Sequence, residues 1–294
     1  MRVLVAGGSG FIGGHLVESL IERGYETIIY DLKEPDSFQF NGDVILGDVT
    51  DSDLISKSIC NVDVVFDCSG ILGSAETFEH IMKTAEANIT GTLSVLKACH
   101  DFNKPLVYLS LKNKWYNPYM ITKRSASEFC FMYSEYMNLP VTVVKGLNAY
   151  GPRQHWEPVR KVFPSFVVNS LQDKPITIFG DGNQIVDMIW VKDLVEILIL
   201  VAEKNIWGES IDAGTGIPIT VKELAKLIII TSHSKSLIDY LPMRIGEPEH
   251  AVALADPLKC KRLLNYYPKV SLNEGVEIAV GWYRKNYSVF GKLI

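Results

Sequence analysis

The sequence predicts an α/β fold: a doubly wound parallel sheet followed by a smaller α/β lobe at the C-terminal end. Over the first 145 residues, short apolar runs rich in β-branched residues alternate with longer stretches of helical periodicity. Strands that are apolar on both faces and alternate with helices are typical of a parallel sheet covered on two sides. After Tyr150, proline and glycine become frequent, most densely at Gly180-Asp181-Gly182-Asn183. This change indicates loop-rich structure, and we expect a cleft between the sheet and the smaller lobe.

Each element follows from its local pattern. Strands are predicted at Val3–Ala6, Thr27–Tyr30, Val44–Leu46, Val62–Phe66, Leu106–Leu109 and Val141–Lys145. Helices are predicted between them at Phe11–Arg23, Ala75–Phe102 and Tyr119–Met137. The second half adds a helix at about Val191–Lys204, a strand at Ser210–Ala213 and a helix at Val221–Ile230. We expect a first domain of residues 1–146, to which about 185–215 return, and a second of residues 147–294.

Composition narrows the classes of protein that remain. The 294 residues suffice for one large α/β domain or two modest ones, each with a full core. With 47% hydrophobic and 21% charged residues, the chain is typical of neither disordered nor fibrous proteins. Its net charge of -5 offers no electrostatic reason to bind DNA or RNA over a broad surface. We therefore expect no nucleic-acid partner, although a few cations can still hold a small anionic ligand.

Mean hydropathy is +0.12, which is slightly high for a water-soluble chain. Charges nevertheless break the most apolar stretches, Val195–Ala202 and Leu224–Ile230, well short of the ~20 residues of a spanning helix. The N-terminus runs from Met1 directly into a predicted strand, without the apolar segment of a signal peptide. No CxxC spacing occurs among Cys60, Cys68, Cys99, Cys130 and Cys260. We expect a cytoplasmic protein with reduced thiols, no membrane association and no metal.

The helix predicted at Tyr119–Met137 carries apolar or aromatic side chains on every side, at Phe129, Cys130, Phe131, Met132, Tyr133, Tyr136 and Met137. A helix that is apolar all round is buried all round. A central core helix and a subunit interface both satisfy this condition. We favour a homodimer in which this helix and the one at about 75–102 pack against their symmetry mates, because the two carry more apolar surface than one sheet face can cover.

A glycine-rich turn gives the strongest local signal. Gly7-Gly8-Ser9-Gly10-Phe11-Ile12-Gly13 lies directly after a predicted strand and directly before an amphipathic helix. Glycines at Gly7, Gly10 and Gly13 let the backbone turn tightly and approach a pyrophosphate, toward which the free N–H groups of the helix then point. The spacing is GxxGxxG, and the strand-turn-helix context is what this mechanism requires. The turn predicts a dinucleotide site.

Two acidic residues follow later strands. Asp31 closes the second predicted strand about twenty residues past the turn, where a carboxylate hydrogen-bonds an adenosine ribose and repels a 2′-phosphate. This favours NAD over NADP, with Lys33 the nearest cation. Asp48-Val49, after the third strand, is a candidate adenine contact, although the pair also fits an ordinary turn.

Tyr119 and Lys123 stand four residues apart at the start of a helix, so both project from one face. A phenol with a pKa near ~10 is a poor base at neutral pH. A nearby ammonium and an oxidised nicotinamide stabilise the phenolate and lower its pKa. The pair can then take a proton from a sugar hydroxyl while hydride leaves its carbon. The pair also lies after the fifth strand, at the sheet edge where such folds bind ligands.

In these motifs the chain resembles the extended short-chain dehydrogenase/reductase family, specifically its NAD-dependent nucleotide-sugar epimerase/dehydratase branch, UDP-glucose 4-epimerases included. The resemblance covers nearly the whole chain. Besides the glycine turn, Asp31 and Gly47-Asp48-Val49, it rests on Asn88–Thr92, Pro118–Lys123, Asn148–Gln154, Phe179–Gly182, Val191–Asp193, Ala213–Gly216, Arg244–Pro248 and Ala255-Asp256.

The resemblance implies a Rossmann-type domain and a C-terminal domain that holds a nucleoside-diphosphate sugar. It makes Tyr119 the catalytic base and Lys123 a ligand of the nicotinamide ribose, with Ser110 beside them. It assigns NAD contacts to Gly7, Gly10, Phe11, Ile12, Gly13, Asp31, Asp48, Val49, Cys68, Ser69, Gly70 and Lys123. It assigns substrate contacts to Ser74, Asn148, Lys161, Val162, Phe179 and Arg244. A guanidinium suits the diphosphate, because it binds phosphate oxygens with two hydrogen bonds.

Three departures from the family pattern bear on the chemistry. A Ser-Ser or Ser-Thr pair is usual after the fifth strand, and its second hydroxyl polarises the reacting oxygen; here the pair is Ser110-Leu111. The connection from that strand to Tyr119 is also shorter than usual, which leaves a repositioned Ser110, Asn113 or water to replace the missing hydroxyl. Val186 stands where an arginine usually precedes Asp187, so Lys161 or Arg160 is left to compensate for a diphosphate contact.

These departures select among the family's reactions. A 4,6-dehydratase needs an acid/base carboxyl just after the Ser/Thr position, and UDP-glucuronate decarboxylases also have a glutamate there, whereas this chain has Leu111-Lys112-Asn113. C4 epimerisation through a transient 4-keto sugar needs only Tyr119, Lys123 and a hydrogen-bond donor, so a 4-epimerase of an NDP-sugar, UDP-hexose foremost, is the leading hypothesis. The alternatives are a 4-ketosugar reductase or C4 dehydrogenase, less so a 4,6-dehydratase, and a non-catalytic NAD or nucleotide-sugar binding protein. The sequence leaves the base and the sugar open.

Overall fold

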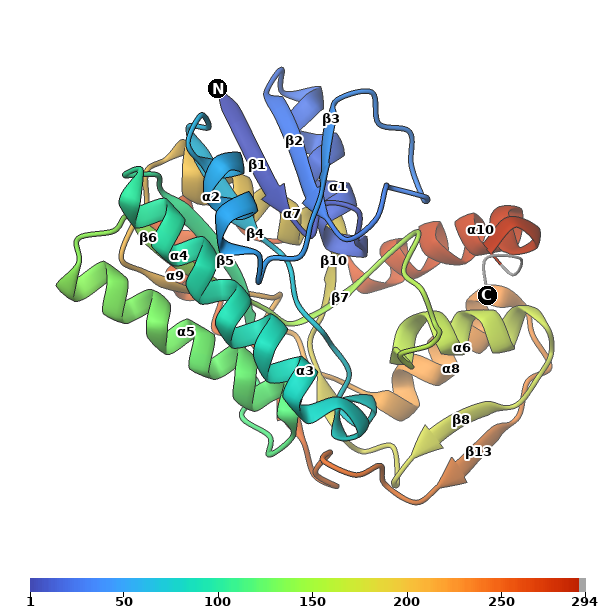
Figure 1. Cartoon of the computed structure of the whole chain (residues 1–294). Helices are drawn as coiled ribbons and strands as arrows, with labels where there is room; N and C mark the ends of the chain where they lie inside the picture. The colour runs from blue at the N-terminus through green and yellow to red at the C-terminus, as the bar shows by residue number, and fades with distance from the viewer. Residues whose placement is uncertain (291–294) are drawn as a thin grey trace.

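Seven parallel strands form the central sheet, and the predicted fold class is confirmed (Figure 1). The computed structural model describes residues 1–290. The strands are β1 (Arg2–Ala6), β2 (Glu26–Asp31), β3 (Asp43–Leu46), β4 (Val64–Asp67), β5 (Leu106–Leu111), β6 (Val141–Gly146) and β11 (Ser210–Ala213). Their order is β11-β6-β5-β4-β1-β2-β3. The chain direction across the sheet therefore reverses between β1 and β4, and ligands of such sheets bind in the crevice at the carboxyl ends of those strands.

Helices cover both faces of this sheet. On one face α1 (Phe11–Glu22) packs beside α7 (Val191–Glu203), and on the other α4 (Thr92–Asp101) packs between α2 (Ser52–Ile59) and α5 (Pro118–Tyr136). Because side chains alternate along a strand, Val3 and Val5 join the apolar cluster beneath α1 while Leu4 joins the one beneath α4. All three are fully buried, which is why the strand is apolar throughout.

A smaller lobe follows β6 and has its own apolar core. Its helices are α6 (Val162–Leu171), α8 (Val221–Ser232) and α10 (Leu272–Phe290), and β8 (Ile176–Phe179) pairs with β13 (Ile238–Leu241). Two further small sheets pair β7 (Asn148–Tyr150) with β10 (Met188–Trp190), and place β9 (Ile185–Val186) between β12 (Ile219–Thr220) and β14 (Val252–Ala253). Helix α9 (Leu258–Leu264) packs beside β11 and α7. The chain thus returns to the main sheet through α7 and β11 before completing the lobe.

The continuous helix predicted at Ala75–Phe102 is wrong. The segment instead forms a 3₁₀-helix (Glu76–His80), α3 (Ile81–Ala85), a π-helical turn (Glu86–Gly91) and then α4. The π-turn accompanies Asn88, whose buried side-chain amide hydrogen-bonds both backbone groups of Ile71 on the loop after β4. A tertiary contact therefore sets the helical geometry here, and sequence periodicity does not register it.

Four helices, α2, α6, α9 and α10, do not appear among the predicted elements. Helix α6 lies in a stretch predicted to be loop-dominated, partly because of Pro164. Pro164 occupies the third residue of the helix, where the missing N–H has no intrahelical partner to lose. Proline therefore marks the start of this helix and not its end.

Helix α5 lies at the outside of the sheet beside α3 and α4 (Figure 1). Its inner face is fully buried at Ala126 and Cys130, whereas Met132 is 38% exposed and Tyr136 is 74% exposed. The alternative of a central core helix is thus wrong. Apolar side chains remain on its outer face, and the expected homodimer stays a prediction.

The segment after β7 is tied to α1 by a buried polar cluster. Arg153, which has a left-handed φ of 67°, donates to Glu18 (3.0 Å) and to Nδ1 of His15 (2.9 Å). The other ring nitrogen of His15 donates to the Pro152 carbonyl at 3.1 Å. Since Nδ1 accepts a hydrogen bond, this arrangement requires a neutral imidazole, and burial together with Arg153 lowers the pKa of His15 to about 4.

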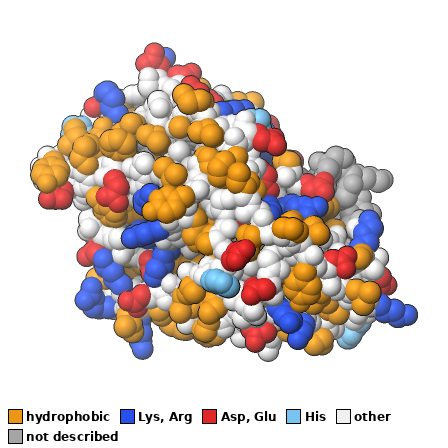
Figure 2. Space-filling model, turned by 90° about the horizontal axis from the view of Figure 1, so that it is seen from below, with side chains coloured by type: hydrophobic (Ala, Val, Ile, Leu, Met, Phe, Trp, Pro, Cys, Tyr) orange, Lys and Arg blue, Asp and Glu red, His pale blue; other side chains and the backbone are white. Residues whose placement is uncertain are grey.

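The surface carries side chains of every type. Figure 2 shows hydrophobic side chains on one face scattered among Lys, Arg, Asp and Glu, with both signs of charge side by side. Within residues 1–290, no helix combines the length and apolarity that crossing a membrane would take.

Candidate active site

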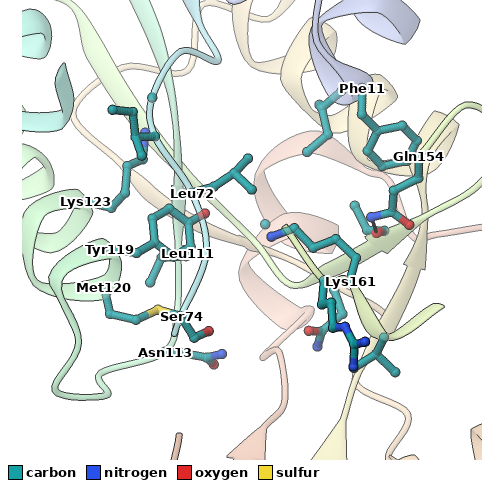
Figure 3. A pocket seen from close by; sticks show the side chains of 18 of the residues that line it. Phe11, Leu72, Ser74, Leu111, Asn113, Tyr119, Met120, Lys123, Gln154 and Lys161 are labelled. Carbon is teal, nitrogen blue, oxygen red and sulfur yellow. Dashed lines mark hydrogen bonds between the residues drawn. The ribbon is translucent and has the colours of Figure 1, made fainter. Parts of the chain in front are cut away.

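A cleft of about 750 Å³ opens between the carboxyl ends of the sheet strands and the smaller lobe. Every residue that was predicted to serve catalysis, cofactor or substrate lines it (Figure 3). They come from the turn after β1, from α1, β2, the loops after β3 and β4, β5, α5, β7, the junction before α6, β8 and the segment after β13. Positions spread over the whole chain therefore meet in one place.

The glycine turn approaches β4 so closely that no side chain fits. Gly7 has a φ of 76°, and a Cβ there would lie 2.9 Å from backbone atoms of Cys68 and Ser69. A Cβ on Gly13 would lie 2.0 Å from the Gly7 carbonyl oxygen. Gly10 caps α1 without a side-chain hydrogen bond, so the first N–H groups of the helix have no side-chain acceptor. This cradle fits the pyrophosphate of a dinucleotide.

Asp31, the last residue of β2, lines the cleft beside the glycine turn. Its carboxylate accepts hydrogen bonds from the backbone N–H groups of Ser9 (2.9 Å) and Leu32 (2.7 Å), which hold it beside the glycine turn. Lys33 pairs instead with Asp36 at 2.5 Å. Lys33 is therefore paired with Asp36 and does not offset the charge of Asp31. The arrangement suits an unphosphorylated ribose, as in NAD.

The structure positions Tyr119 through the start of α5. Asn117 caps this helix by accepting from the Met120 N–H (2.9 Å), and Pro118 occupies the first turn. The amide of Asn117 also donates to the Gly246 carbonyl at 2.9 Å. This bond ties the start of the helix to the segment that carries Arg244, so the two sides of the cleft are connected next to Tyr119.

Lys123, one turn further along α5, is 5% exposed and points under the loop after β4. Its Nζ donates to the Ser69 carbonyl at 3.3 Å and lies 4.2 Å from the centre of the Tyr108 ring. Burial lowers the pKa of Lys123, and the Asp67 carboxylate opposes that shift. Burial also raises the pKa of Tyr119 to about 12. Tyr119 is therefore protonated at neutral pH until a bound cation stabilises its phenolate.

Sequence reasoning missed Asp67, the last residue of β4. It is fully buried, and Oδ1 accepts from the Ser69 N–H (2.9 Å) and hydroxyl (2.6 Å). Oδ2 is buried without a hydrogen-bond partner among the described residues. The available signal was a single acidic residue at the end of an otherwise apolar strand.

Ser110 does not direct its hydroxyl at Tyr119. It is 6% exposed, and its Oγ lies 2.7 Å from Oγ of Ser127 in the interior of α5. The next residue, Leu111, lies beside Tyr119 in the cleft (Figure 3). Geometry therefore gives no support to a catalytic Ser110; besides Lys123, the polar side chains that Figure 3 labels near Tyr119 are Ser74, Asn113 and Lys161.

Arg244 is held in the cleft by two carboxylates. Its guanidinium donates to Glu76 at 3.0 Å and to Glu247 at 2.5 Å, and it lies 5.4 Å from the centre of the Phe179 ring. Glu76 belongs to the segment after β4, whereas Arg244 and Phe179 belong to the smaller lobe. The guanidinium and the aromatic ring are thus adjacent, as the resemblance implies for a nucleotide subsite, and Glu76 is a partner that the sequence did not reveal.

Asp187, which directly precedes β10, anchors the small sheet formed by β7 and β10. This carboxylate is fully buried and accepts hydrogen bonds from Thr215, Gly216 and Ala255 at 2.7 to 3.1 Å. The Asn148 amide donates to the Asp187 carbonyl at 3.2 Å, which fixes Asn148 at the wall of the cleft. Asp187 therefore holds together three segments on which the smaller lobe depends.

Comparisons with known proteins agree with this geometry. The family described as NAD dependent epimerase/dehydratase matches residues 3–214. A UDP-N-acetyl-alpha-D-glucosaminuronate decarboxylase of Bacillus cytotoxicus is 29% identical over 97% of this chain and 98% of its own.

Solved structures are similar over nearly the whole chain. The UDP-glucose 4-epimerase of Thermotoga maritima, with UDP-glucose, is 28% identical with a TM-score of 0.91, over 98% of this chain and 100% of its own. The UDP-glucuronic acid 4-epimerase of Bacillus cereus, in complex with UDP-glucuronic acid and NAD, is 26% identical with a TM-score of 0.88 over the same shares. The chain belongs to the NAD-dependent epimerase/dehydratase family of nucleotide-sugar enzymes, within the extended short-chain dehydrogenases/reductases.

Proposed function

We propose that this enzyme is an NAD-dependent 4-epimerase of a nucleoside-diphosphate sugar, with UDP the first nucleotide to test. The observation that carries the proposal is the pairing of Tyr119 and Lys123 beside a β5–α5 connection that contains no carboxylate. Elimination across C5 and C6 requires an acid/base group at that connection, whereas transfer of hydrogen at C4 does not. Leu111 and Asn113 occupy the cleft there instead.

In the proposed reaction Tyr119 accepts the proton of the sugar 4-hydroxyl as the C4–H bond breaks. When bound, NAD supplies the redox chemistry by accepting hydride from C4 and returning it. The product of the first half is a 4-keto sugar, and Tyr119 returns the proton to its oxygen in the second half. Inversion requires the keto sugar to present its other face, for which a cleft of about 750 Å³ leaves room.

The residues around Tyr119 suit this role. Because burial raises the pKa of Tyr119 to about 12, its phenolate forms readily only when positive charge is added near it. Lys123 supplies one such charge from the same helix face, and the carbonyl of Ser69 holds its ammonium under the cofactor side of the cleft. The proton of Tyr119 is thus retained until cofactor and substrate are both in place.

Two alternatives follow from particular observations. A 4-ketosugar reductase or C4 dehydrogenase uses the same pair with an exchanging cofactor, but Asp31 favours NAD over the NADPH that reductases usually draw on. A non-catalytic binding protein is favoured by Leu111 and by the inward bond of Ser110. The latter predicts ligand binding without turnover of any nucleotide sugar.

The test is proton NMR of the purified protein with UDP-glucose, UDP-N-acetylglucosamine and their uronates. We expect NAD to be released on denaturation and one sugar to equilibrate with its C4 epimer. Tyr119→Phe should lower kcat by about 10²–10⁴-fold. Absence of any change in all four sugars with NAD present would refute the proposal, and a stable 4-keto-6-deoxy product would replace it with a dehydratase.

For organisation, we propose a cofactor domain of residues 1–146 with 185–215, and a substrate lobe formed by the rest. We also propose a cytoplasmic homodimer through the outer faces of α3 and α5. Ile81, Met82, Ile121, Met132 and Tyr136 are all at least 38% exposed there, and α3 and α5 pack against each other. A face of this kind is self-complementary in a two-fold dimer.

A further inference from the structure

Lys161 presents a cation to the reacting end of the cleft. It directly precedes α6, and its side chain extends across the cleft toward Tyr119 (Figure 3). The ammonium nitrogen lies 5.9 Å from the centre of the Tyr119 ring. Over residues 1–290 this nitrogen has neither a hydrogen-bond acceptor nor an ion-pair partner. Among the described residues the ammonium therefore has no directly bonded counter-charge and is open to the cleft.

The nearest acidic groups are already engaged. Glu76 and Glu247 both bind the guanidinium of Arg244, at 3.0 and 2.5 Å. Glu76 also accepts from the Arg160 backbone N–H at 3.1 Å, and its Oε2 has no hydrogen-bond partner among the described residues. These two carboxylates and the two cations Arg244 and Lys161 sum to zero charge, but neither carboxylate bonds the Lys161 ammonium. Burial, together with Arg244, lowers the pKa of Lys161 to about 8, although Glu76 and Glu247 oppose the shift. The ammonium is thus partly desolvated without a hydrogen bond in return, and a ligand carboxylate would remove that penalty.

The position of Lys161 relative to Tyr119 selects one part of a bound sugar. If Tyr119 receives the proton of the 4-hydroxyl, C4 lies at the phenol oxygen. C6 is attached to C5, directly next to C4, whereas the diphosphate is attached to C1 on the opposite side of the ring. A cation that faces Tyr119 across the cleft is therefore closer to the C6 substituent than to the diphosphate, which has Arg244 at its disposal.

We propose that the sugar is a hexuronate and that Lys161 selects it by pairing with the C6 carboxylate. This inference rests on the proposed C4 chemistry at Tyr119. In this proposal Lys161 determines specificity for the sugar. The alternative is the role expected from the sequence, in which Lys161 contacts the diphosphate. A neutral hexose would leave the half-buried Lys161 ammonium without a directly bonded partner, so the site favours the uronate over it.

The matched pair of ligands is UDP-glucuronate and UDP-glucose, which differ only at C6. Binding is measured by calorimetry on the NAD-loaded Tyr119→Phe protein, in which turnover does not interfere, and kcat/KM is measured by NMR on the otherwise unaltered enzyme. We expect both quantities to favour the uronate by about 10- to 100-fold, the range of one hydrogen bond to a charged group. Lys161→Met should abolish the preference, Lys161→Arg should keep most of it, and Lys226→Met, an exposed lysine of α8 outside the cleft, should leave it unchanged.

pH supplies a second readout. Above pH 8 the free Lys161 amine loses its proton, so affinity for UDP-glucuronate should fall while affinity for UDP-glucose stays constant. The groups facing this amine are Tyr119 of α5, Glu76 after β4, and Arg244 and Glu247 after β13. None of these is expected to differ between the two ligands, and Lys161→Met should remove the dependence.

The outcomes separate this inference from the proposed function. Equal binding, or no binding, of the two UDP-sugars overturns the hexuronate assignment. If Lys161→Met lowers the affinity for both UDP-sugars equally, the assignment is also overturned, and Lys161 is assigned to the diphosphate. Uronate-selective binding without turnover supports Lys161 and refutes the epimerase. Release of CO₂ from UDP-glucuronate supports Lys161 as well, but replaces epimerisation with decarboxylation.

Discussion

Replacing Gly13 by alanine tests the cofactor cradle with the smallest possible change. An added Cβ would lie 2.0 Å from the Gly7 carbonyl oxygen, 2.8 Å from the Gly7 carbonyl carbon and 2.9 Å from Cα of Gly8. All three neighbours are backbone atoms, so no side-chain rotation relieves the overlap. To reach even 3.0 Å, the shortest contact must lengthen by 1 Å, which moves the turn relative to the start of α1.

A shift of this size displaces the N–H groups that the cradle offers to a pyrophosphate. Hydrogen bonds to charged groups contribute about 1.5–3 kcal/mol each. Loss of two of them lowers NAD affinity by at least about 100-fold. Overpacking itself destabilises the fold by about 1–3 kcal/mol. We therefore expect Gly13→Ala to purify folded, with a lower melting temperature and without NAD.

The matched control is Gly281→Ala in α10. A Cβ at Gly281 meets no atom within 4 Å. Alanine is the better residue in a helix interior by about 1 kcal/mol, so this variant should be slightly more stable and keep its NAD. NAD released on denaturation, calorimetric titration of NAD and thermal unfolding are measured for both. A folded Gly13→Ala protein that binds NAD with unchanged affinity would refute the cradle.

Three further predictions use other parts of the molecule. Because the pKa of His15 is about 4 in the folded protein, against 6.5 for an unperturbed histidine, the unfolded chain binds a proton first as pH falls. Stability should thus drop by about 3 kcal/mol between pH 6.5 and 4, and His15→Gln should flatten that part of a urea-unfolding series. Asp67→Asn removes the carboxylate that opposes the lowered pKa of Lys123, so the alkaline limb of the pH–rate profile should move to lower pH. Asp67→Glu should restore the position of that limb. A lower maximal rate without a shift of the limb would indicate a purely structural role for Asp67. Tyr136→Glu on the outer face of α5 should convert a dimer into a monomer in light scattering, with NAD content unchanged; a wild-type chain that is already monomeric contradicts the proposed interface.

Most of the sheet was predictable from local signals, and the site residues assigned from motifs and the family resemblance all line the cleft, whereas Asp67 and Glu76 were missed. β1, the glycine turn and α1 combine an apolar run, three glycines and an amphipathic repeat, and each is a statement about neighbouring residues. Helix α6 was not predictable in this way, because a proline such as Pro164 is tolerated in the first turn of a helix but breaks a helix in its interior. The π-turn at Asn88 was not predictable either, since it accompanies a bond to Ile71, 17 residues away.

Residue order alone was sufficient for the fold class, the family and many of the residues that line the cleft. These depend on backbone requirements and on spacing along the chain, which the order of residues records directly. The tertiary structure was needed to show which partners each polar group has there. It directs the Ser110 hydroxyl into α5, places Asp67 where it acts on Lys123, engages Arg244 with Glu76, and leaves the Lys161 ammonium facing Tyr119. Hydrogen bonds and charges act through space over a few ångströms, so the partners of a side chain emerge only when distant segments are brought together.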